Sequence, residues 1–551
     1  MKSNMRKKIM AILLSGVICA SNFAVPSFAS EIAVGSIVES ETEGDIVSAS
    51  TEIMEDNTEE STVENTAENT EDNSARALDE SEQDILTTLS AETGTFADLG
   101  ELKTFYENNT VALQDALDFT NYNNKIIGAN ANGLILLSCV ENESFEGYTI
   151  KLSGLSGGGS NLSAQVDGFP AYHFKGLGRS EKPFKGTITV SEATTVSYID
   201  LTLDRPFFNA VDVASAKING ITIINIITAS ESVVAFAQEV SGIAQEGSWD
   251  NVEVNIKAYK YVDNEATTIT YPGSCIGTIK SNTSFSLRKI CYESPAKVNE
   301  KSGNAGLLCN EIENNATFQV GSVEVSGSVS IIAGSGKAAA GLVGDIAENA
   351  SLSIGSTEKL TINENWEIKG KNAGALIGKG KNAVLDLNVE VNGAKVTSNE
   401  GLGSAGGIFG SYQLTSTATD KAFQTYDVTN GKIQVTNVVL DATGDNSCCG
   451  ALFGVLELSK DFSVNASTSD AVTVTSTAGL AMSGSHYVLK GSTTYGGLAG
   501  QVYGTDSSDS MPALKISGNI SVSSTTNGDV TYYGGLIGVL GKPGIDAANK
   551  N

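Results

Sequence analysis

Few residues in this 551-residue chain are of the types that carry acid–base or metal chemistry. It contains two histidines, His173 and His486, and neither lies in the HExxH sequence that binds zinc and activates water. A serine triad would also need one of these histidines. Residues 154–158 (GLSGG) fit the Gly-x-Ser-x-Gly elbow by letter, but no helical pattern follows Ser156. We therefore predict no catalytic, cofactor-binding or metal-binding residue.

Carboxylates leave one enzyme class open. Glycoside hydrolysis needs paired carboxylates, and a polysaccharide lyase needs a base together with a cation that neutralises the anionic sugar. With 64 Asp and Glu residues, chance pairs such as Asp200 and Asp204 are inevitable. The Gly-His-Gly, Arg-Ile-Lys and Asn-Thr-Asp sequences of polysaccharide-active enzymes are missing. Such an enzyme stays an alternative interpretation, with less support than a binding protein.

Aromatic side chains and calcium are two further routes to binding. Exposed aromatic rings often bind carbohydrate, and the candidates are Trp249, Trp366, Tyr495, Tyr532 and Tyr533. The tyrosines could equally stack on one another along the surface. Neither an EF-hand loop nor a Gly-Gly-x-Gly-x-Asp repeat is present, so no calcium site is predicted.

Charge excludes one class of partner and marks a separate N-terminal segment. The net charge of −29 makes nucleic acid a poor partner. Residues 31–84 hold 18 acidic residues against Arg76 alone. We expect residues 30–92, rich in Ser, Thr and Glu, to be disordered because they cannot bury enough apolar area to offset the entropy of ordering.

Residues 1–29 have the form of a secretory signal peptide. A basic start is followed by a mostly apolar stretch from Ile9 to Ile18, and cleavage is expected after Ala29. The apolar core is short of the roughly 20 residues that a spanning helix needs, and no later segment reaches that length. We therefore expect secretion, possible association with the cell surface, and no transmembrane segment in the mature chain.

Cysteines outside the signal peptide are sparse. Six in a chain of this length are too few for a disulfide-built scaffold, and no CxxC pair suggests zinc. We expect most of them to be buried as small apolar side chains. They are Cys139, Cys275, Cys291, Cys309, Cys448 and Cys449.

Periodicity predicts one short helix followed by many short strands. Residues 95–107 have Leu99, Leu102, Phe105 and Tyr106 on one side at helical spacing, with Thr95 as N-cap. This helix either caps the end of a β domain or packs beside it, and residues 93–173 would form the cap and the first coils. Alternating runs then predict strands with one buried face, at 323–325, 352–354, 360–362, 385–391, 433–435, 472–474 and 514–516.

A glycine-rich pentad recurs through the second half of the chain. Its copies are 340–344 (AGLVG), 374–378 (GALIG), 406–410 (GGIFG), 450–454 (GALFG), 496–500 (GGLAG) and 534–538 (GGLIG), and 305–309 (AGLLC) reads as an earlier copy with cysteine last. From 309 onward the steps are 35, 34, 32, 44, 46 and 38 residues. Such a period with variable insertions is typical of a solenoid.

The pentad has a physical explanation in packing. Glycine lets stacked backbones pass closely and permits positive φ at a bend, while the central Leu or Ile would form an apolar ladder. A phosphate-binding loop would need a following Lys-Ser or Lys-Thr, which is absent. The structural repeat residues are Gly341, Leu342, Gly344, Gly374, Leu376, Gly378, Gly407, Ile408, Gly410, Gly450, Leu452, Gly454, Gly497, Leu498, Gly500, Gly535, Leu536 and Gly538.

The pentad resembles the GLUG motif of bacterial extracellular and surface proteins. Residues 174–187 (FKGLGRSEKPFKGT) are similar to the segment that opens such repeat regions. The resemblance implies a right-handed parallel β-helix over residues 174–551, similar in architecture to pectate-lyase-like folds and displayed outside a Gram-positive cell. GLUG repeats also accompany a metallopeptidase type that needs HExxH, which this chain lacks.

The function expected from these features is adhesion or ligand display without catalysis. The partner would be an extracellular ligand, a host or matrix glycan or protein. A polysaccharide-active β-helix enzyme and the non-catalytic stem of a larger surface protein are the alternatives.

Overall fold

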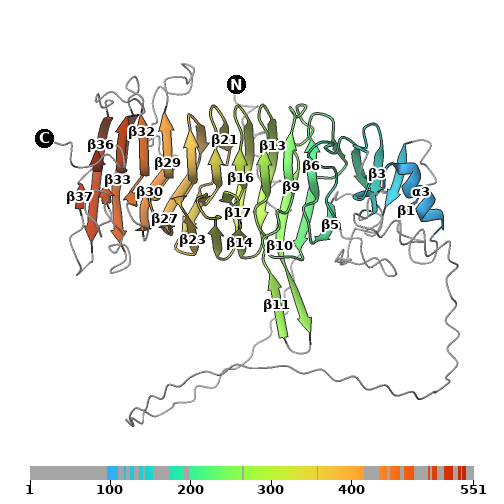
Figure 1. The fold of residues 1–551 in the computed structure, drawn as a ribbon, viewed down its shortest axis with the longest axis horizontal. Coiled ribbons are helices and arrows are strands. Elements are labelled where there is room, and N and C mark those ends of the chain that lie inside the picture. Colours follow the sequence, from blue (N-terminus) through green and yellow to red (C-terminus); the bar gives the residue numbers. More distant parts are fainter. Residues whose placement is uncertain are drawn as a thin grey trace, which may run out of the picture. The chain divides into compact units, whose positions relative to one another are not determined.

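The fold comes from a computed structural model (Figure 1). It describes residues 96–540, with gaps at 109–116, 119–124, 130–133, 135, 141–142, 153–173, 191–197, 264–265, 357, 415–432, 443–446, 459–463, 477–493, 497–498, 505–513, 525–531 and 535–536. The chain divides into two units, Met1–Ala77 and Leu78–Asn551. All described residues belong to the second unit, and both the predicted signal peptide with Ala29 and the whole acidic segment 30–92 lie outside them. None of the helices described there has the length and apolar character needed to cross a bilayer.

The described residues begin with the helix α3 (Leu99–Asn108). Its N-cap is Asp98, which accepts a hydrogen bond from the Glu101 N–H at 2.8 Å, so the expectation of Thr95 was wrong by three residues. Leu99, Leu102 and Phe105 are buried in the same core as the strands, as the helical spacing predicted. The helix therefore packs directly on the β structure.

The first sheet starts the β structure. Its order is β1-β2-β3-β4-β7, and all its pairs are parallel except β1 with β2. The strands are β1 (Leu117–Asp118), β2 (Ile126–Ala129), β3 (Thr149–Leu152), β4 (Thr187–Val190) and β7 (Lys217–Asn219).

Four longer parallel sheets follow, named A to D here. Sheet A contains β5 (Tyr198–Leu203), β8 (Ile223–Thr228), β10 (Glu253–Asp263), β13 (Ser284–Tyr292), β17 (Thr317–Val325), β21 (Ser351–Ile354) and β26 (Val384–Leu387), with β11 (Ala266–Thr270) antiparallel to β10. Sheet B contains β6 (Phe208–Asp212), β9 (Ala237–Ser241), β12 (Ile276–Ile279), β16 (Cys309–Ile312), β20 (Val343–Ile346), β25 (Ile377–Lys381), β29 (Phe409–Leu414), β32 (Phe453–Leu458), β35 (Ala499–Gly504) and β38 (Ile537–Leu540).

Sheets C and D complete each turn of the chain. Sheet C contains β14 (Ala296–Asn299), β18 (Val329–Ile332), β23 (Trp366–Gly370), β27 (Val389–Ser398), β30 (Ile433–Ala442), β33 (Val464–Ser476) and β36 (Leu514–Ser524), with β22 (Leu360–Asn363) beside β27. Sheet D contains β15 (Ala305–Gly306), β19 (Ala338–Ala340), β24 (Asn372–Gly374), β28 (Ser404–Gly406), β31 (Cys448–Gly450), β34 (Thr494–Gly496) and β37 (Tyr532–Gly534).

The chain visits these sheets in a repeating order. From β13 in sheet A the chain passes to β14 in sheet C, β15 in sheet D and β16 in sheet B. The next strand, β17, returns to sheet A and lies beside β13. The strands of each coil therefore hydrogen-bond to the equivalent strands of the coils before and after it, and these equivalent strands run parallel. The described residues form an all-β, solenoid-like stack of parallel strands with one short helix, as the repeats predicted.

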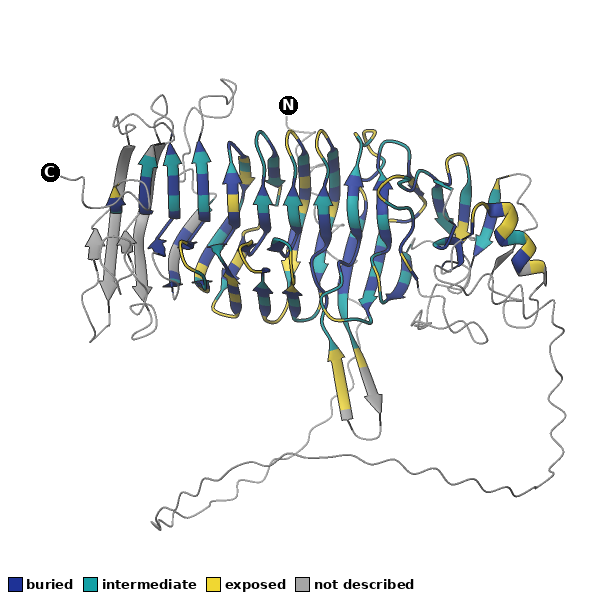
Figure 2. Cartoon of the chain, viewed as in Figure 1, coloured by how far each residue is buried: buried dark blue, intermediate teal, exposed yellow. Residues whose placement is uncertain are grey.

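The interior is a continuous apolar core. Strands alternate between inward and outward side chains, and buried and less buried residues therefore alternate along many of them (Figure 2). The alternation is complete in β8. Phe208, Phe236, Phe285 and Trp249 pack together there, with the Trp249 and Phe285 ring centroids 5.5 Å apart. Trp249 and Trp366 are both buried, so their selection as candidates for exposed carbohydrate-binding rings was wrong.

The pentads occupy equivalent places in successive coils. Their first residues end the strands of sheet D, and their fourth residues begin the strands of sheet B. The central residues Leu342, Leu376, Ile408 and Leu452 are buried, which forms the predicted apolar ladder. Each pentad therefore makes the bend between sheets D and B.

Glycine serves close approach in this bend. A Cβ on Gly374 would overlap the carbonyl oxygen of Ile377, and one on Gly410 would lie 2.6 Å from the Ala373 nitrogen in the preceding coil. No pentad glycine among the described residues has positive φ, so that part of the explanation was wrong. In this chain the missing side chain matters at these positions, and the backbone freedom of glycine does not.

Backbone register moves the earliest copy by one residue. Gly306 pairs with Ala340, and Cys309 pairs with Val343. The copy is therefore 306–310 (GLLCN), in which cysteine replaces the fourth residue and Asn310 the last glycine. The same register places Ile276 beside Cys309, which adds a further copy at 273–277 (GSCIG) that the sequence analysis missed.

The bend from sheet B to sheet A uses asparagine. Asn282, Asn315, Asn349 and Asn382 all have positive φ, between 45° and 60°. Each N–H donates to a carbonyl of the following coil, as from Asn282 to Asn314 at 3.0 Å. Asparagine tolerates this left-handed conformation better than most residues do, which explains its recurrence here.

Candidate ligand groove between β17 and β22

A break in strand pairing produces a groove on the outside of the stack. The strands β17 and β21 pair only from Thr317 to Val320, because β21 ends at Ile354. The next strand of the chain, β22, pairs with β27 and with no other described strand. The second half of β17 and one side of β22 therefore face each other without being paired.

The segment between these strands explains the break. The chain leaves sheet A after Gly355, whose N–H donates to the Val320 carbonyl at 2.9 Å. At the far side, the Asn388 side chain donates to the Ser356 carbonyl at 2.9 Å. Asn388 lies between β26 and β27, so the predicted single strand 385–391 is in fact divided into two strands.

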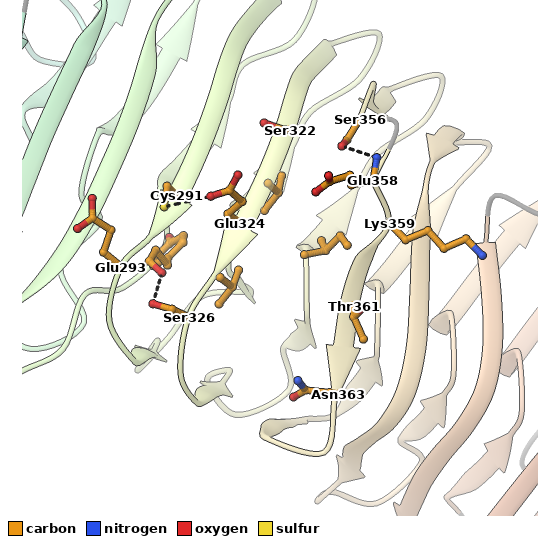
Figure 3. Close-up of a pocket in the computed structure, with 14 residues that line it drawn as sticks. Cys291, Glu293, Ser322, Glu324, Ser326, Ser356, Glu358, Lys359, Thr361 and Asn363 are labelled. Carbon is orange, nitrogen blue, oxygen red and sulfur yellow. Dashed lines mark hydrogen bonds between the residues drawn. The ribbon is translucent and has the colours of Figure 1, made fainter. Parts of the chain in front are cut away.

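The groove has a volume of about 580 Å³ and is lined by three parts of the chain (Figure 3). The lining residues on one side come from the ends of β13 and β17, and those on the other are Ser356, Glu358, Lys359 and residues of β22. They are Cys291, Tyr292, Glu293, Ser322, Val323, Glu324, Val325, Ser326, Ser356, Glu358, Lys359, Leu360, Thr361 and Asn363.

Carboxylates dominate the charge of the lining. Glu293, Glu324 and Glu358 stand against Lys359. Glu324 forms an ion pair with Lys289 at 2.8 Å, and Glu293 forms one with Lys257 at 2.7 Å. The hydrogen bond from Lys289 to Glu324 raises the pKa of the lysine, which keeps it protonated. The lining side chains themselves carry an excess of negative charge.

Cys291 places a thiol in the groove. It is half-buried, whereas the other five free cysteines among the described residues are buried, as expected for most of them. Its Sγ lies 4.0 Å from Glu324 Oε2. Burial, which outweighs the attraction of Lys289, raises the pKa of the thiol, so it is a weak nucleophile at neutral pH.

The backbone of β17 presents hydrogen-bonding groups to the groove. The Ser326 N–H donates to the Tyr292 carbonyl at 2.8 Å. The backbone groups of successive residues in a strand point to opposite edges. The N–H and C=O groups of Ser322 and Glu324 therefore also point toward β13, and those of Val323 and Val325 point into the groove. By the same alternation, the Leu360 N–H bonds to Asn388 and the backbone groups of Thr361 point into the groove from the other side.

The earlier candidates for chemistry lie elsewhere. The Asp200 carboxylate accepts a hydrogen bond from Asn225 at 2.7 Å, and Asn225 accepts one from Asn255 at 2.9 Å, so Asp200 belongs to a polar ladder in sheet A. His173, His486 and the 154–158 segment are outside the described residues, as are the side chains of Tyr495, Tyr532 and Tyr533. Backbone register does place Tyr495 beside Tyr533.

No cluster of three or more metal-binding side chains is found in the described ranges. The alternating residues predicted the strands at 323–325 and 360–362, but that pattern did not predict the groove between them. The available signal was the five-residue segment 355–359, which follows one alternating run and precedes the next.

Comparisons with known proteins identify no relative. No protein-family model matches the chain, and neither a curated protein nor a solved structure matches it.

Proposed function

We propose that the chain is an exported β-helix protein that binds an extracellular ligand without chemical turnover, in adhesion or surface display. The observation that carries the proposal is the groove between β17 and β22, a hollow on the outside of a rigid stack. Regular parallel strands hold its two sides, and this suits recognition of a ligand from solution.

The other parts of the proposal rest on the sequence. The first 29 residues support secretion, and the recurring pentads support a GLUG-type repeat protein of a Gram-positive bacterium with a right-handed coil. The repeating order of sheets A, C, D and B is consistent with such a coil.

Ion pairing favours binding over carbohydrate cleavage at this groove. Glu293 and Glu324 each form an ion pair with a lysine, so their oxygens are already bound within the protein. A glycosidase would need two carboxyl groups that are free to act on the scissile bond, one of them as the general acid. The groove therefore supports ligand binding better than hydrolysis.

The test is an array of host glycans and matrix proteins probed with the full mature chain, with product analysis on the same polysaccharides. We expect saturable binding to at least one extracellular component and no cleavage products. Release of oligosaccharides that a single groove substitution, Glu324→Gln, abolishes would overturn the proposal in favour of an enzyme. Expression in a Gram-positive host with N-terminal sequencing tests export, with Ser30 expected as the first residue.

A further inference from the structure

We infer that the groove is a slot for one extended peptide strand with alternating apolar and basic side chains. The inference rests on the proposed binding function and specifies its partner. It begins from the open edge of β17, where the backbone groups of Val323 and Val325 point into the groove. A peptide strand can bond to such an edge as an additional strand of the sheet.

Length agrees with this occupant. The part of β17 that lines the groove runs from Ser322 to Val325, and four residues of strand span roughly 13 Å. Thr361 and Asn363 line the opposite side of the groove. Their strand, β22, follows the path of the coil as the other strands do. A strand lying along β17 would therefore have polar groups of β22 on its other side.

The inward side chains of the peptide should be apolar. Val323 and Leu360 are buried, while Val325 is only partly buried against the core at the margin of the groove. Side chains on one face of a sheet lie next to their neighbours in the adjoining strand. Every second residue of the peptide would thus cover Val325 and shield it from water.

The outward side chains of the peptide should be basic. Glu324 points outward from β17, and Glu293 and Glu358 lie on either side of it in the lining. An acidic segment, such as residues 31–84 of this chain, would be repelled there, and so would an anionic glycan. A lysine or arginine beside Glu324 would add an opposite-charge cross-strand pair to the ion pair that Glu324 already forms with Lys289.

The experiment measures binding of labelled model peptides to the full chain by fluorescence anisotropy. The probe is an acetylated peptide of repeating Lys-Val units. Its controls are a Glu-Val peptide of equal length and a Lys-Val peptide with methylated backbone nitrogens, which keeps the charge but cannot form strand hydrogen bonds. We expect both controls to bind at least about tenfold more weakly than the probe.

Variants locate the binding site. Val325→Pro removes an N–H that points into the groove and should abolish binding, and Glu324→Gln should weaken it about threefold. The exposed Glu246→Gln, outside the groove, is the matched control and should leave binding unchanged. On the unmodified chain, the bound peptide should also slow alkylation of Cys291, a readout that does not depend on any variant folding.

Either of two results with the model peptides would overturn the slot. One is equal binding of the methylated and unmethylated peptides, and the other is full reactivity of Cys291 at saturating peptide. If the chain binds array components but groove substitutions change nothing, the slot is wrong and the binding function stands. If the peptide binds in the groove while no array component binds, the slot stands and the proposed binding of a glycan or matrix protein is wrong.

Discussion

The hydroxyl of Tyr412 bonds to both backbone groups of Ala383. It accepts from the Ala383 N–H at 3.1 Å and donates to the Ala383 carbonyl at 3.2 Å, and the tyrosine is buried in β29. Gly380, paired with Tyr412 in the preceding coil, leaves room for the ring, since a Cβ there would lie 2.9 Å from it. Tyr412 thus fixes the turn that follows β25.

Removing this hydroxyl should destabilise the stack. Tyr412→Phe deprives two buried backbone groups of a partner, which typically costs about 1–3 kcal/mol of unfolding free energy. Tyr271→Phe is the control, because Tyr271 is half-buried and no hydrogen bond of its hydroxyl is seen among the described residues. Urea denaturation of both variants measures the difference. Equal midpoints would show that the Tyr412 hydroxyl contributes nothing.

Adding a methyl group to a pentad should also destabilise the stack. Gly374→Ala places a Cβ against the Ile377 carbonyl, and overpacking of this kind costs about 1–3 kcal/mol. Ala340 holds the same position one coil earlier, so the backbone can adapt and the chain should still fold. Gly303→Ala is the control, with its nearest atom 3.7 Å away. A thermal melt unchanged by Gly374→Ala would contradict the packing explanation.

The asparagine bend should distinguish backbone conformation from side-chain contact. Asn315 has φ of 57°, which costs a residue such as alanine roughly 1–2 kcal/mol. Asn315→Ala should therefore lower the unfolding free energy by about that amount. Asn315→Gly should lower it much less, because glycine adopts this φ freely. If chemical denaturation shows the two variants to be equally unstable, the Asn315 side chain matters more than its φ.

Two neighbouring glutamates should respond oppositely to neutralisation. Burial and the nearby Asp345 raise the pKa of Glu311, so its contribution to stability falls as pH rises above the ordinary carboxyl range. Burial also raises the pKa of Glu313, but hydrogen bonds from Ser281 and Lys280 lower it below the ordinary value. Its stabilising contribution is present at neutral pH and is lost as pH falls through that lowered pKa.

Denaturation at two pH values tests this contrast. At pH near 7, Glu311→Gln should stabilise the chain by a few tenths to about 1 kcal/mol, and Glu313→Gln should destabilise it by a similar amount. At pH near 2 the effect of Glu311→Gln should vanish, since both states then carry a protonated Glu311. A destabilising effect of Glu311→Gln at neutral pH would show that the charge is compensated.

Local patterns in the sequence were sufficient to predict the strands and the stacked repeats. Alternating runs such as 352–354 fix which side chains face inward, and the pentads recur where the chain bends from sheet D to sheet B. Exact alignment required tertiary register, because Ala305 and Gly306 look equally suitable as the first residue of a copy. The helix start was missed because Asp98 is a better cap than Thr95 once Glu101 is placed three residues later.

The groove depends on information that local pattern does not contain. The residues 323–325 form a strand in either case, but only the end of β21 at Ile354 leaves their outer edge unpaired. Similarly, Trp249 gives no sign in its own sequence neighbourhood that Phe208, Phe236 and Phe285 will pack against it. Both features arise from which coil lies next to which.

The ladders of backbone hydrogen bonds between adjacent coils have a mechanical consequence. Because each coil is held by the strands beside it, force applied to the last coil loads a few hydrogen-bond ladders at a time and leaves the others at rest. A coil of 34 residues, the step between Gly344 and Gly378, would lengthen the tether by roughly 120 Å when it detaches. When a single molecule is stretched, its extension should therefore rise in discrete steps as coils detach one after another. A particle attached to the chain would then be slowed in stages instead of being lost in one rupture.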